Sequence, residues 1–553
     1  MQLITFLGFT IFVALVAYLS TRNTKEDSSD GYFLGGRSLT AGVIAGSLLL
    51  TNLSTEQIVG LNGQAFTEGI LVMAWETLAA IAMVVTAIFL LPRYLKGGLT
   101  TVPQFLGNRF DKTTKTITSL LFLSGYVVVL LPIVLYSGAV AFSAMFDLPD
   151  LFGVSRIQSI WICVWGIGII GSIYAVFGGL KAVAVSDTVN AVGLLIGGIM
   201  IPIFGLSYLG EGSVSAGFTE LFTSHPEKFN SIGDVKASVP FATIFTGMML
   251  VQVFYWGTNQ AIIQRALAAK NLREGQKGLI LASFIKILGP LILVIPGMIA
   301  FSIFGDTLAN PDEAYPKLVS KVLPPSLVGF FAAVLFGAIL SSFNSALNSS
   351  VTLFGIDIYK EYFKKEATEK EVVKAGKIFG VLLAFLAMFI APLIDEAPDG
   401  LFGYLQEVNG CYSIPILTII VVGYLTKKVP AIAAKIAVLL GVIFYSISQF
   451  ILKPSLINRA MANAEAAGIT GTELDYIKAE AYPHFLHVMA ILFILNVIIM
   501  LTIGYFYPRT TVFKLEYTEQ VDITPWKYVK QVGMAVCIIV IGIYIYFSPL
   551  ILG

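Results

Sequence analysis

Charged residues are scarce in this chain of 553 residues. Asp, Glu, Lys and Arg together make up 12% of the sequence, whereas hydrophobic residues make up 56%. Soluble globular proteins carry roughly 25% charged residues, so the composition excludes an ordinary soluble domain and favours a chain that faces lipid. The net charge of +1 carries no signal of nucleic acid binding.

Cysteine and histidine are also rare. Cys163, Cys411 and Cys537 all lie in apolar segments, where small core residues are the simplest interpretation, and they suggest neither a disulfide framework nor a zinc site. His484 and His487 are spaced three apart, but no further metal ligand accompanies them. The chain has no HExxH sequence and no nucleophile elbow, so we expect no enzymatic activity.

Long apolar runs recur along the whole chain. A helix of about twenty apolar residues crosses the roughly 30 Å hydrocarbon core of a bilayer. The sequence therefore predicts an all-α polytopic membrane protein, with one transmembrane domain over 1–553 and about fourteen helices. The predicted spans are 2–20, 38–63, 66–92, 116–146, 157–177, 182–208, 240–263, 278–304, 325–358, 376–396, 401–426, 432–452, 483–507 and 531–552.

Lys and Arg are distributed unevenly over the predicted connections. If the N-terminus lies outside, the cytoplasmic connections hold 26 of the 35 Lys and Arg residues and the outer connections hold 8. Because these residues are retained preferentially on the cytoplasmic side, we expect the N-terminus and the C-terminus to lie outside the cell membrane. The contrast is clearest between 359–377, which is rich in lysine, and 395–400, which has no basic residue.

Polar side chains inside the predicted spans are few. A charged side chain at the middle of a membrane helix costs about 2.5 to 3.5 kcal/mol, so each one is a candidate for function. Glu76 and Lys286 both lie in the middle of a span, and leaving either unpaired would be costly. Other residues have plainer interpretations. Interhelical packing would explain Asn348, Ser349 and Ser350. For Glu56 and Glu407 two interpretations stay open: a solvated or helix-capping role near a membrane surface, and a substrate contact.

Two polar stretches share one pattern. "LLLTNLSTEQIVG" in the second span and "VFYWGTNQAII" in the seventh each place Asn, Gln and Thr near a Gly at the middle of a helix. A helix that stops and restarts there exposes unpaired carbonyls and N–H groups, which are tolerated only where they line a cavity or bind a ligand.

The spacing of these two stretches predicts an internal repeat. They are five spans apart, and a unit with an odd number of crossings must invert when it is repeated in tandem. We predict a first repeat over 38–208 and an inverted second repeat over 240–426, with a binding site at the paired breaks. The segment 2–20 is then an extra N-terminal helix, and 432–552 holds peripheral C-terminal helices.

Several longer stretches carry a more specific signal. They are "DGYFLGGRSL", "TNLSTEQIVGLNG", "TVPQFLGNRF", "YWGTNQAIIQRALAAKNLREGQKG", "AILSSFNSALNSSVTLFGIDIYKEY" and "GYLQEVNG". Together they resemble the sodium/solute symporter family, in particular its bacterial sodium/sugar cotransporters of the SGLT type. The resemblance implies a LeuT-type 5+5 inverted-repeat core and Na⁺-coupled import of a small solute by alternating access.

The resemblance also implies a Na⁺ site. Its ligands would be the backbone carbonyls of Leu50, Leu53 and Ala338 and the hydroxyls of Ser341 and Ser342. Na⁺ is a hard cation that prefers oxygen ligands, and adjacent hydroxyls facing an unwound segment supply them. Asp187 matches an acidic residue on the family's Na⁺ exit route. A surface residue at a helix start is the alternative interpretation of Asp187.

A substrate site is implied as well. Its polar contacts map onto Asn52, Gln57, Glu76, Gln252, Lys286 and Gln406, and its aromatic residues map onto Tyr255, which closes the inner path, and Trp75. Carboxylate and amide oxygens accept hydrogen bonds from sugar hydroxyls, while ammonium and amide nitrogens donate to them. Leu130, Ala79 and Gln252 depart from the residues expected at their positions, which leaves the identity of the sugar open.

Other functions stay open at this point. The solute could be inositol, sialic acid or another carboxylate, and a passive channel or a sensor could share the architecture. A carboxylate substrate would favour a cation without an acidic partner, so the presence of Glu76 together with Lys286 favours a neutral polyol. The expected partners are the solute, Na⁺ and the lipid bilayer.

Overall fold

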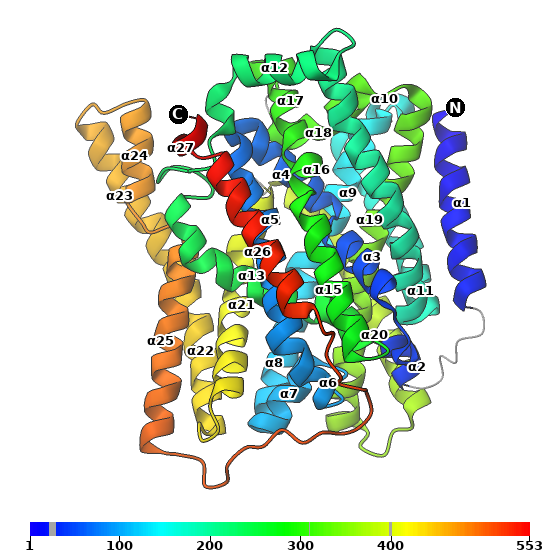
Figure 1. Ribbon diagram of the computed structural model, residues 1–553, viewed down its shortest axis with the longest axis vertical. Coiled ribbons are helices and arrows are strands. Elements are labelled where there is room, and N and C mark those ends of the chain that lie inside the picture. The colour runs from blue at the N-terminus through cyan, green and yellow to red at the C-terminus, as the bar shows by residue number, and fades with distance from the viewer. Residues whose placement is uncertain (22–28, 309, 397–400, 553) are drawn as a thin grey trace.

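The computed structural model describes residues 1–21, 29–308, 310–396 and 401–552, and nearly all of them belong to helices. Figure 1 shows long helices packed side by side in one bundle, with both chain termini at the same end. Over the described residues there is no β-strand, only an isolated bridge between Leu39 and Ala269. The predicted all-α architecture is confirmed. The predicted outer loop 395–400 lies, from residue 397 on, outside the described residues.

The first half of the chain contributes α1 to α12. Their bounds are α1 Gln2–Thr21, α2 Ser29–Leu34, α3 Ala41–Asn52, α4 Thr55–Glu68, α5 Ala74–Val85, α6 Leu91–Lys96, α7 Val102–Arg109, α8 Lys112–Gly125, α9 Leu131–Phe146, α10 Leu148–Phe152, α11 Arg156–Leu209 and α12 Val214–Ser224. Two π-helical segments, η3 Thr86–Leu90 and η4 Tyr126–Leu130, continue α5 into α6 and α8 into α9.

The second half contributes α13 to α27. Their bounds are α13 Gly247–Gly257, α14 Gln260–Leu267, α15 Leu272–Ile287, α16 Gly289–Leu293, α17 Ile295–Phe304, α18 Ala314–Val322, α19 Pro325–Thr352, α20 Glu369–Ile390, α21 Leu401–Leu425, α22 Ala431–Ile447, α23 Lys453–Ala466, α24 Thr472–Glu480, α25 Phe485–Phe506, α26 Val529–Tyr546 and α27 Pro549–Leu552. The π-helical segments η9 Leu353–Phe363 and η11 Ser448–Leu452 extend α19 and α22.

The number of spanning helices depends on how broken helices are treated. In the described part of the chain, eleven helices are long and apolar enough to cross a membrane, or twelve if the bent pair Leu272–Ile287 and Gly289–Phe304 forms one span. Two of the predicted spans are broken into α3 and α4, of 12 and 14 residues, and into α13 and α14, of 11 and 8 residues. Each half is too short to cross the hydrocarbon core alone, so fourteen spans stay a prediction.

Burial separates the core of the bundle from its periphery. In the most apolar 18-residue stretch of Thr55–Lys96 and of Pro325–Phe363, 78% of the residues are buried. The corresponding share is 11% for Gln2–Ser20 and 22% for Val529–Tyr546. α3 packs against α11, α15 and α19, and α13 packs against α5 and α21. The two broken helices therefore lie inside the bundle, where their polar breaks are shielded from lipid.

Candidate functional site

The break between α3 and α4 is visible in the backbone hydrogen bonds. The Leu53 N–H donates to the Leu49 carbonyl at 2.7 Å, and the helical pattern resumes where the Ile58 N–H donates to the Ser54 carbonyl at 2.9 Å. Between them, ψ is 55° at Leu53 and 177° at Ser54, both outside the helical range. The last carbonyls of α3 therefore face the gap, as the helix termini of a broken span must. The predicted break is confirmed.

The second predicted break lies between α13 and α14 and is also confirmed. Asn259 caps α14, since its side-chain oxygen accepts from the Ala261 N–H at 3.0 Å and from the Tyr126 hydroxyl at 2.7 Å. The Gly257 carbonyl, at the end of α13, accepts from the Tyr94 hydroxyl at 3.0 Å. A Cβ on Gly257 would lie 2.4 Å from the Leu90 side chain, so the close approach of η3 requires glycine here.

α19 presents hydroxyls to the first break. The Ser342 hydroxyl donates to the Thr51 carbonyl at 2.8 Å, and the Thr51 hydroxyl lies 3.4 Å from the Ser341 oxygen and 3.2 Å from the Ser345 oxygen. The five residues predicted to bind Na⁺ are all buried: Leu50, Leu53, Ala338, Ser341 and Ser342. The structure thus brings the end of α3 and the serines of α19 into contact.

Asp187 lies inside the bundle. It is on α11, is 1% exposed, and accepts from the Ser47 hydroxyl of α3 at 2.7 Å. The alternative interpretation of Asp187 as a surface residue at a helix start is therefore wrong, because the long helix α11 continues on both sides of it.

Arg265 is a buried cation that the sequence did not single out. It is fully buried on α14, its guanidinium donates to the hydroxyls of Ser47 and Ser345, and it lies close enough to Asp187 to attract it. The predicted span ended at 263, so Arg265 counted as a cytoplasmic loop residue. Its place inside "NQAIIQRALAAK", directly after a helix break, is the one signal that could have identified it.

A cavity of about 50 Å³, which we call the central cavity, lies between the two broken helices, α5, α15 and α21. Its lining includes seven of the eight residues predicted to bind the substrate: Asn52, Gln57, Trp75, Gln252, Tyr255, Lys286 and Gln406. The eighth, Glu76, is fully buried behind the lining, where it contacts Gln57 and Lys286. Four further polar lining residues were not among the predicted substrate contacts: Glu56, Asn259, Asn409 and Tyr412.

A chain of polar contacts crosses the wall of the central cavity. The Asn52 amide donates to the Gln57 oxygen at 2.8 Å, and the Gln57 amide donates to Glu76. The second oxygen of Glu76 lies 2.5 Å from the Lys286 ammonium, and the two side chains are 0% and 1% exposed. Lys286 is the one Lys or Arg among the described residues that line the cavity, and Glu76 neutralises it, so the lining offers no unpaired cation to an anionic solute.

Several polar atoms at the central cavity have no hydrogen-bond partner. They are the Asn52 side-chain oxygen, the Trp75 indole nitrogen and one oxygen of Glu56. Glu56 is 7% exposed and lines the cavity, so of its two interpretations the one at a membrane surface is wrong. Unpaired buried polar atoms are rare, which suits a site that holds water or a polar ligand.

A much larger chamber lies at the end of the bundle that holds both termini. This vestibule, of about 1480 Å³, is lined by residues of α4, α21, α23, α24 and the start of α25. Trp75 lines both the vestibule and the central cavity, and its ring meets the Phe402 ring edge to face at 5.2 Å. Trp75 therefore lies between the two spaces, and Phe402 packs against it as part of the lining of the central cavity.

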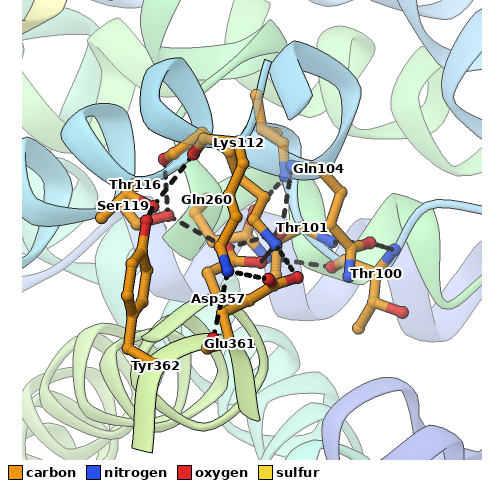
Figure 2. Close-up of polar contacts among 12 residues, drawn as sticks. Thr100, Thr101, Gln104, Lys112, Thr116, Ser119, Gln260, Asp357, Glu361 and Tyr362 are labelled. Atoms are coloured by element: carbon orange, nitrogen blue, oxygen red, sulfur yellow. Dashed lines mark hydrogen bonds and ion pairs between the residues drawn. The ribbon is translucent and has the colours of Figure 1, made fainter. Parts of the chain in front are cut away.

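The opposite end of the bundle is held together by a polar network (Figure 2). Asp357 of η9 is fully buried and accepts from the hydroxyls of Thr101 at 2.9 Å and Ser119 at 3.1 Å, and it lies 3.8 Å from the Lys115 ammonium. Glu361, one turn on, pairs with Lys115 at 2.9 Å. These contacts tie α7 and α8 to the end of α19.

Gln260 extends the same network to the second broken helix. Its side-chain oxygen accepts from the Val102 N–H at 2.8 Å, and its amide donates to the Thr100 carbonyl at 3.2 Å. At the end of the bundle opposite the vestibule, these contacts therefore join segments that are far apart in the sequence (Figure 2).

Solved structures define the class of this fold. A Na⁺-coupled sialic acid symporter in a substrate-bound outward-open state superposes with a TM-score of 0.69 at 18% identity, covering 92% of this chain and 98% of that one. Mhp1, a nucleobase-cation-symport-1 family transporter, superposes with a TM-score of 0.52 at 14% identity, covering 86% of this chain and 95% of that one. The fold is that of the LeuT-type Na⁺-coupled transporters.

The family is defined by sequence. The model of the sodium:solute symporter family matches residues 32–441, and the chain belongs to this family. It is a sodium-using membrane transporter rather than an enzyme.

Curated relatives extend the match along the chain. YidK of Escherichia coli strain K12, described as an uncharacterized symporter, is 44% identical over 98% of this chain and 90% of its own length. The sodium/glucose cotransporter of Vibrio parahaemolyticus is 31% identical over 81% of this chain and 86% of its own length. The human sodium/myo-inositol cotransporter 2 is 30% identical over 76% of this chain and 65% of its own length.

Proposed function

We propose that this protein imports a neutral sugar or related polyol across the cell membrane, driven by Na⁺ that enters with it. The observation that carries this proposal is the ion pair of Glu76 and Lys286 at the central cavity, with 2.5 Å between its charged atoms. Because Glu76 already neutralises Lys286, and Glu56 is the other charged residue of the described lining, the site offers amides, rings and hydrogen-bonding groups but no counter-ion for an anionic solute. Similarity to a glucose cotransporter and to inositol cotransporters supports the same class of solute.

The Na⁺ site of this proposal lies where α3 ends against α19. The carbonyls of Leu50, Leu53 and Ala338 and the hydroxyls of Ser341 and Ser342 supply five oxygens, the ligand type that a hard cation prefers. Asn52 lies between Leu50 and Leu53 in the chain and lines the central cavity. Na⁺ bound at the break would order both the ion site and the solute site. Coupling requires only that Na⁺ bind more tightly to the states that can also bind the solute.

In alternating access, a barrier on each side of the solute would open in turn. Trp75 and Phe402 separate the solute from the vestibule, while Tyr255 and the network around Asp357 close the other side. Release of Na⁺ past Asp187 would loosen the contact of α3 with α11 through Ser47. In this proposal the repeats 38–208 and 240–426 move relative to each other, and both termini lie outside the cell.

Uptake into proteoliposomes tests the proposal. The purified protein is given labelled hexoses, pentoses, inositol and sialic acid, with an inward Na⁺ gradient or with K⁺ at the same ionic strength. We expect one neutral polyol to accumulate above equilibrium only with the Na⁺ gradient. Equal flux without the gradient would show a channel, and accumulation of sialic acid alone would overturn the assignment of a neutral solute.

A further inference from the structure

The connection between α25 and α26, residues 507–528, crosses the end of the bundle opposite the vestibule. The structure describes all of it as neither helix nor strand, and Figure 1 shows it running along this end from one helix to the other. We call this segment the strap. It lies beyond residue 441, where the family match ends. Long connections without secondary structure are uncommon in compact domains and are usually functional or disordered, so what holds this one in place is informative.

The first part of the strap is bound to α7 and to the connection between α21 and α22. The Arg509 N–H donates to the Lys428 carbonyl at 2.8 Å, and the Phe513 N–H donates to the Lys427 carbonyl at 3.2 Å. The Arg509 guanidinium donates to the Arg109 carbonyl, at the end of α7, at 2.7 Å. These contacts fix one end of the strap to the bundle.

The middle of the strap is bound to the end of α6. The Thr518 N–H and hydroxyl donate to the Lys96 carbonyl at 3.1 Å and 3.4 Å. The approach is so close that a Cβ on Gly98 would lie 2.6 Å from the Thr518 hydroxyl oxygen. Val521 is 3% exposed and belongs to the same apolar cluster as Leu95 of α6, so burial of an apolar side chain adds to the hydrogen bonds.

The last part of the strap is bound to the start of α15. The Leu272 N–H donates to the Asp522 carbonyl at 2.8 Å. Gln276 is 2% exposed, and its side-chain oxygen accepts from the Trp526 N–H at 2.7 Å. The Gln276 amide donates to the Ala87 carbonyl at 3.0 Å. The strap is thereby joined to α15 and, through Gln276, to the π-helical segment η3 that continues α5 into α6.

The helices bound by the strap are those that carry the buried ion pair. Glu76 is on α5, which η3 continues into α6, and Lys286 is on α15. The strap therefore connects the ends of both helices to α7 and to the connection between α21 and α22. Conformational changes in packed proteins are shifts of whole elements between discrete arrangements. These helix ends cannot shift away from α7 and α21 while the contacts of the strap are in place.

We propose that the strap restrains the opening of this end of the bundle: it holds the ends of α6 and α15 in place and must shift whenever this end opens. Among residues 507–528, all of which the structure describes, Val521 is the one buried residue. Segments that move are held by few buried contacts, so the strap is suited to repeated release. That this end faces the cytoplasm rests on the proposed function, whereas the restraint itself does not.

Hydrogen–deuterium exchange of the purified full-length protein in Na⁺ tests the restraint. Val521→Asp puts a charge in place of the buried anchor and should raise the exchange rate of 91–98 and 272–280 about tenfold. Val512→Asp is the matched control, since Val512 is 58% exposed on the same strap, and should leave both segments unchanged. Exchange of these segments in Val521→Asp equal to that in the unmodified protein would overturn the proposal.

A reversible cross-link tests whether the strap must shift. A Cβ on Gly97 would lie 3.6 Å from the Leu515 side chain, so Gly97→Cys with Leu515→Cys places two thiols side by side on α6 and the strap. Oxidation should slow Na⁺-driven uptake at least tenfold while solute binding persists, and reduction should restore uptake. Leu515→Cys alone, treated in the same way, controls for the native cysteines. Unchanged uptake in the fully cross-linked protein would overturn the proposal.

These outcomes are distinct from failure of the proposed function. The exchange experiment needs only the protein and Na⁺, so it decides the restraint without a known solute. Uptake that continues in the cross-linked protein overturns the restraint and leaves the transport proposal standing. Absence of Na⁺-driven uptake in the unmodified protein, together with faster exchange in Val521→Asp, overturns the transport proposal and supports the restraint.

Discussion

Lys286 on α15 and Glu76 on α5 meet at 2.5 Å, with 1% and 0% of their side chains exposed. They are 210 residues apart, and their helices pack against each other along their length. Gln57 adds a donor to the other oxygen of Glu76, so the carboxylate connects the first broken helix to α15. The pair is thus both a structural element and a wall of the central cavity.

These two roles can be separated by paired substitutions. Lys286→Met alone should lower the amount of folded protein in the membrane, because an unpaired buried charge costs about 3 to 5 kcal/mol. Lys286→Met with Glu76→Gln removes both charges and should restore the membrane level, while sugar uptake stays absent. Immunoblotting of membranes and uptake in the same cells measure the two effects. Normal uptake in the double variant would remove the pair from the substrate site.

Ser342→Ala should weaken the Na⁺ dependence of uptake. The variant removes one proposed Na⁺ ligand and the 2.8 Å bond to the Thr51 carbonyl. We expect the half-saturating Na⁺ concentration to rise about tenfold, which corresponds to about 1.4 kcal/mol. Ser350→Ala is the matched control, since this buried serine of α19 bonds only to the Ala346 carbonyl of its own helix. An unchanged Na⁺ dependence in Ser342→Ala would argue against the site.

Arg265→Lys should impair transport although it keeps the positive charge. The guanidinium donates to Ser47, Ser345 and the Ala261 carbonyl at once, and an ammonium cannot reproduce this planar arrangement. We expect slower uptake and weaker Na⁺ activation, measured as initial rates over a Na⁺ series. Arg273→Lys, on the half-exposed first turn of α15, is the control and should behave as the unmodified protein. Full activity of Arg265→Lys would show that transport needs only the positive charge at this position and not the planar guanidinium.

Asp357→Ala should loosen the closed end of the bundle opposite the vestibule. It removes the hydrogen bonds from Thr101 and Ser119 and leaves Lys115 with Glu361 alone. Hydrogen–deuterium exchange should become faster in 97–111 and 353–363, the segments that Asp357 joins. Lys364→Ala breaks only an exposed ion pair with Glu371 and should leave the exchange of 97–111 unchanged, since exposed pairs contribute little to stability. Equal exchange in both variants would contradict a closing role for Asp357.

Much of the architecture follows from the sequence because its causes are local. Long apolar runs specify helices that cross a membrane, and a polar stretch with a Gly at mid-helix specifies a break. Both predicted breaks are present, at Leu53–Ser54 and at 258–259. The cost of isolated charges in lipid likewise indicated that Glu76 and Lys286 would need partners.

Other features depend on contacts between distant segments, which hydropathy does not detect. For Glu56 and Asp187 a position near a surface was one of two interpretations left open by the sequence, and packing of the surrounding helices buries both. Arg265 lay beyond the predicted end of its span, yet the chain after the break keeps it inside the bundle against α3 and α19. The number of spans also depends on how the halves of broken helices are paired in space.

By itself, therefore, the sequence determined that this protein is a helical membrane transporter with two interrupted helices and a polar interior. Only the tertiary structure decided which polar groups meet: Lys286 with Glu76, Arg265 with Ser345, Asp357 with Lys115, and Lys453 with Glu407. The reason is physical. In lipid, an apolar stretch forms a helix whatever its neighbours are, because a helix pairs its own backbone groups. The partner of a buried charge, in contrast, lies on a distant segment, and the packing of the helices determines which segment that is.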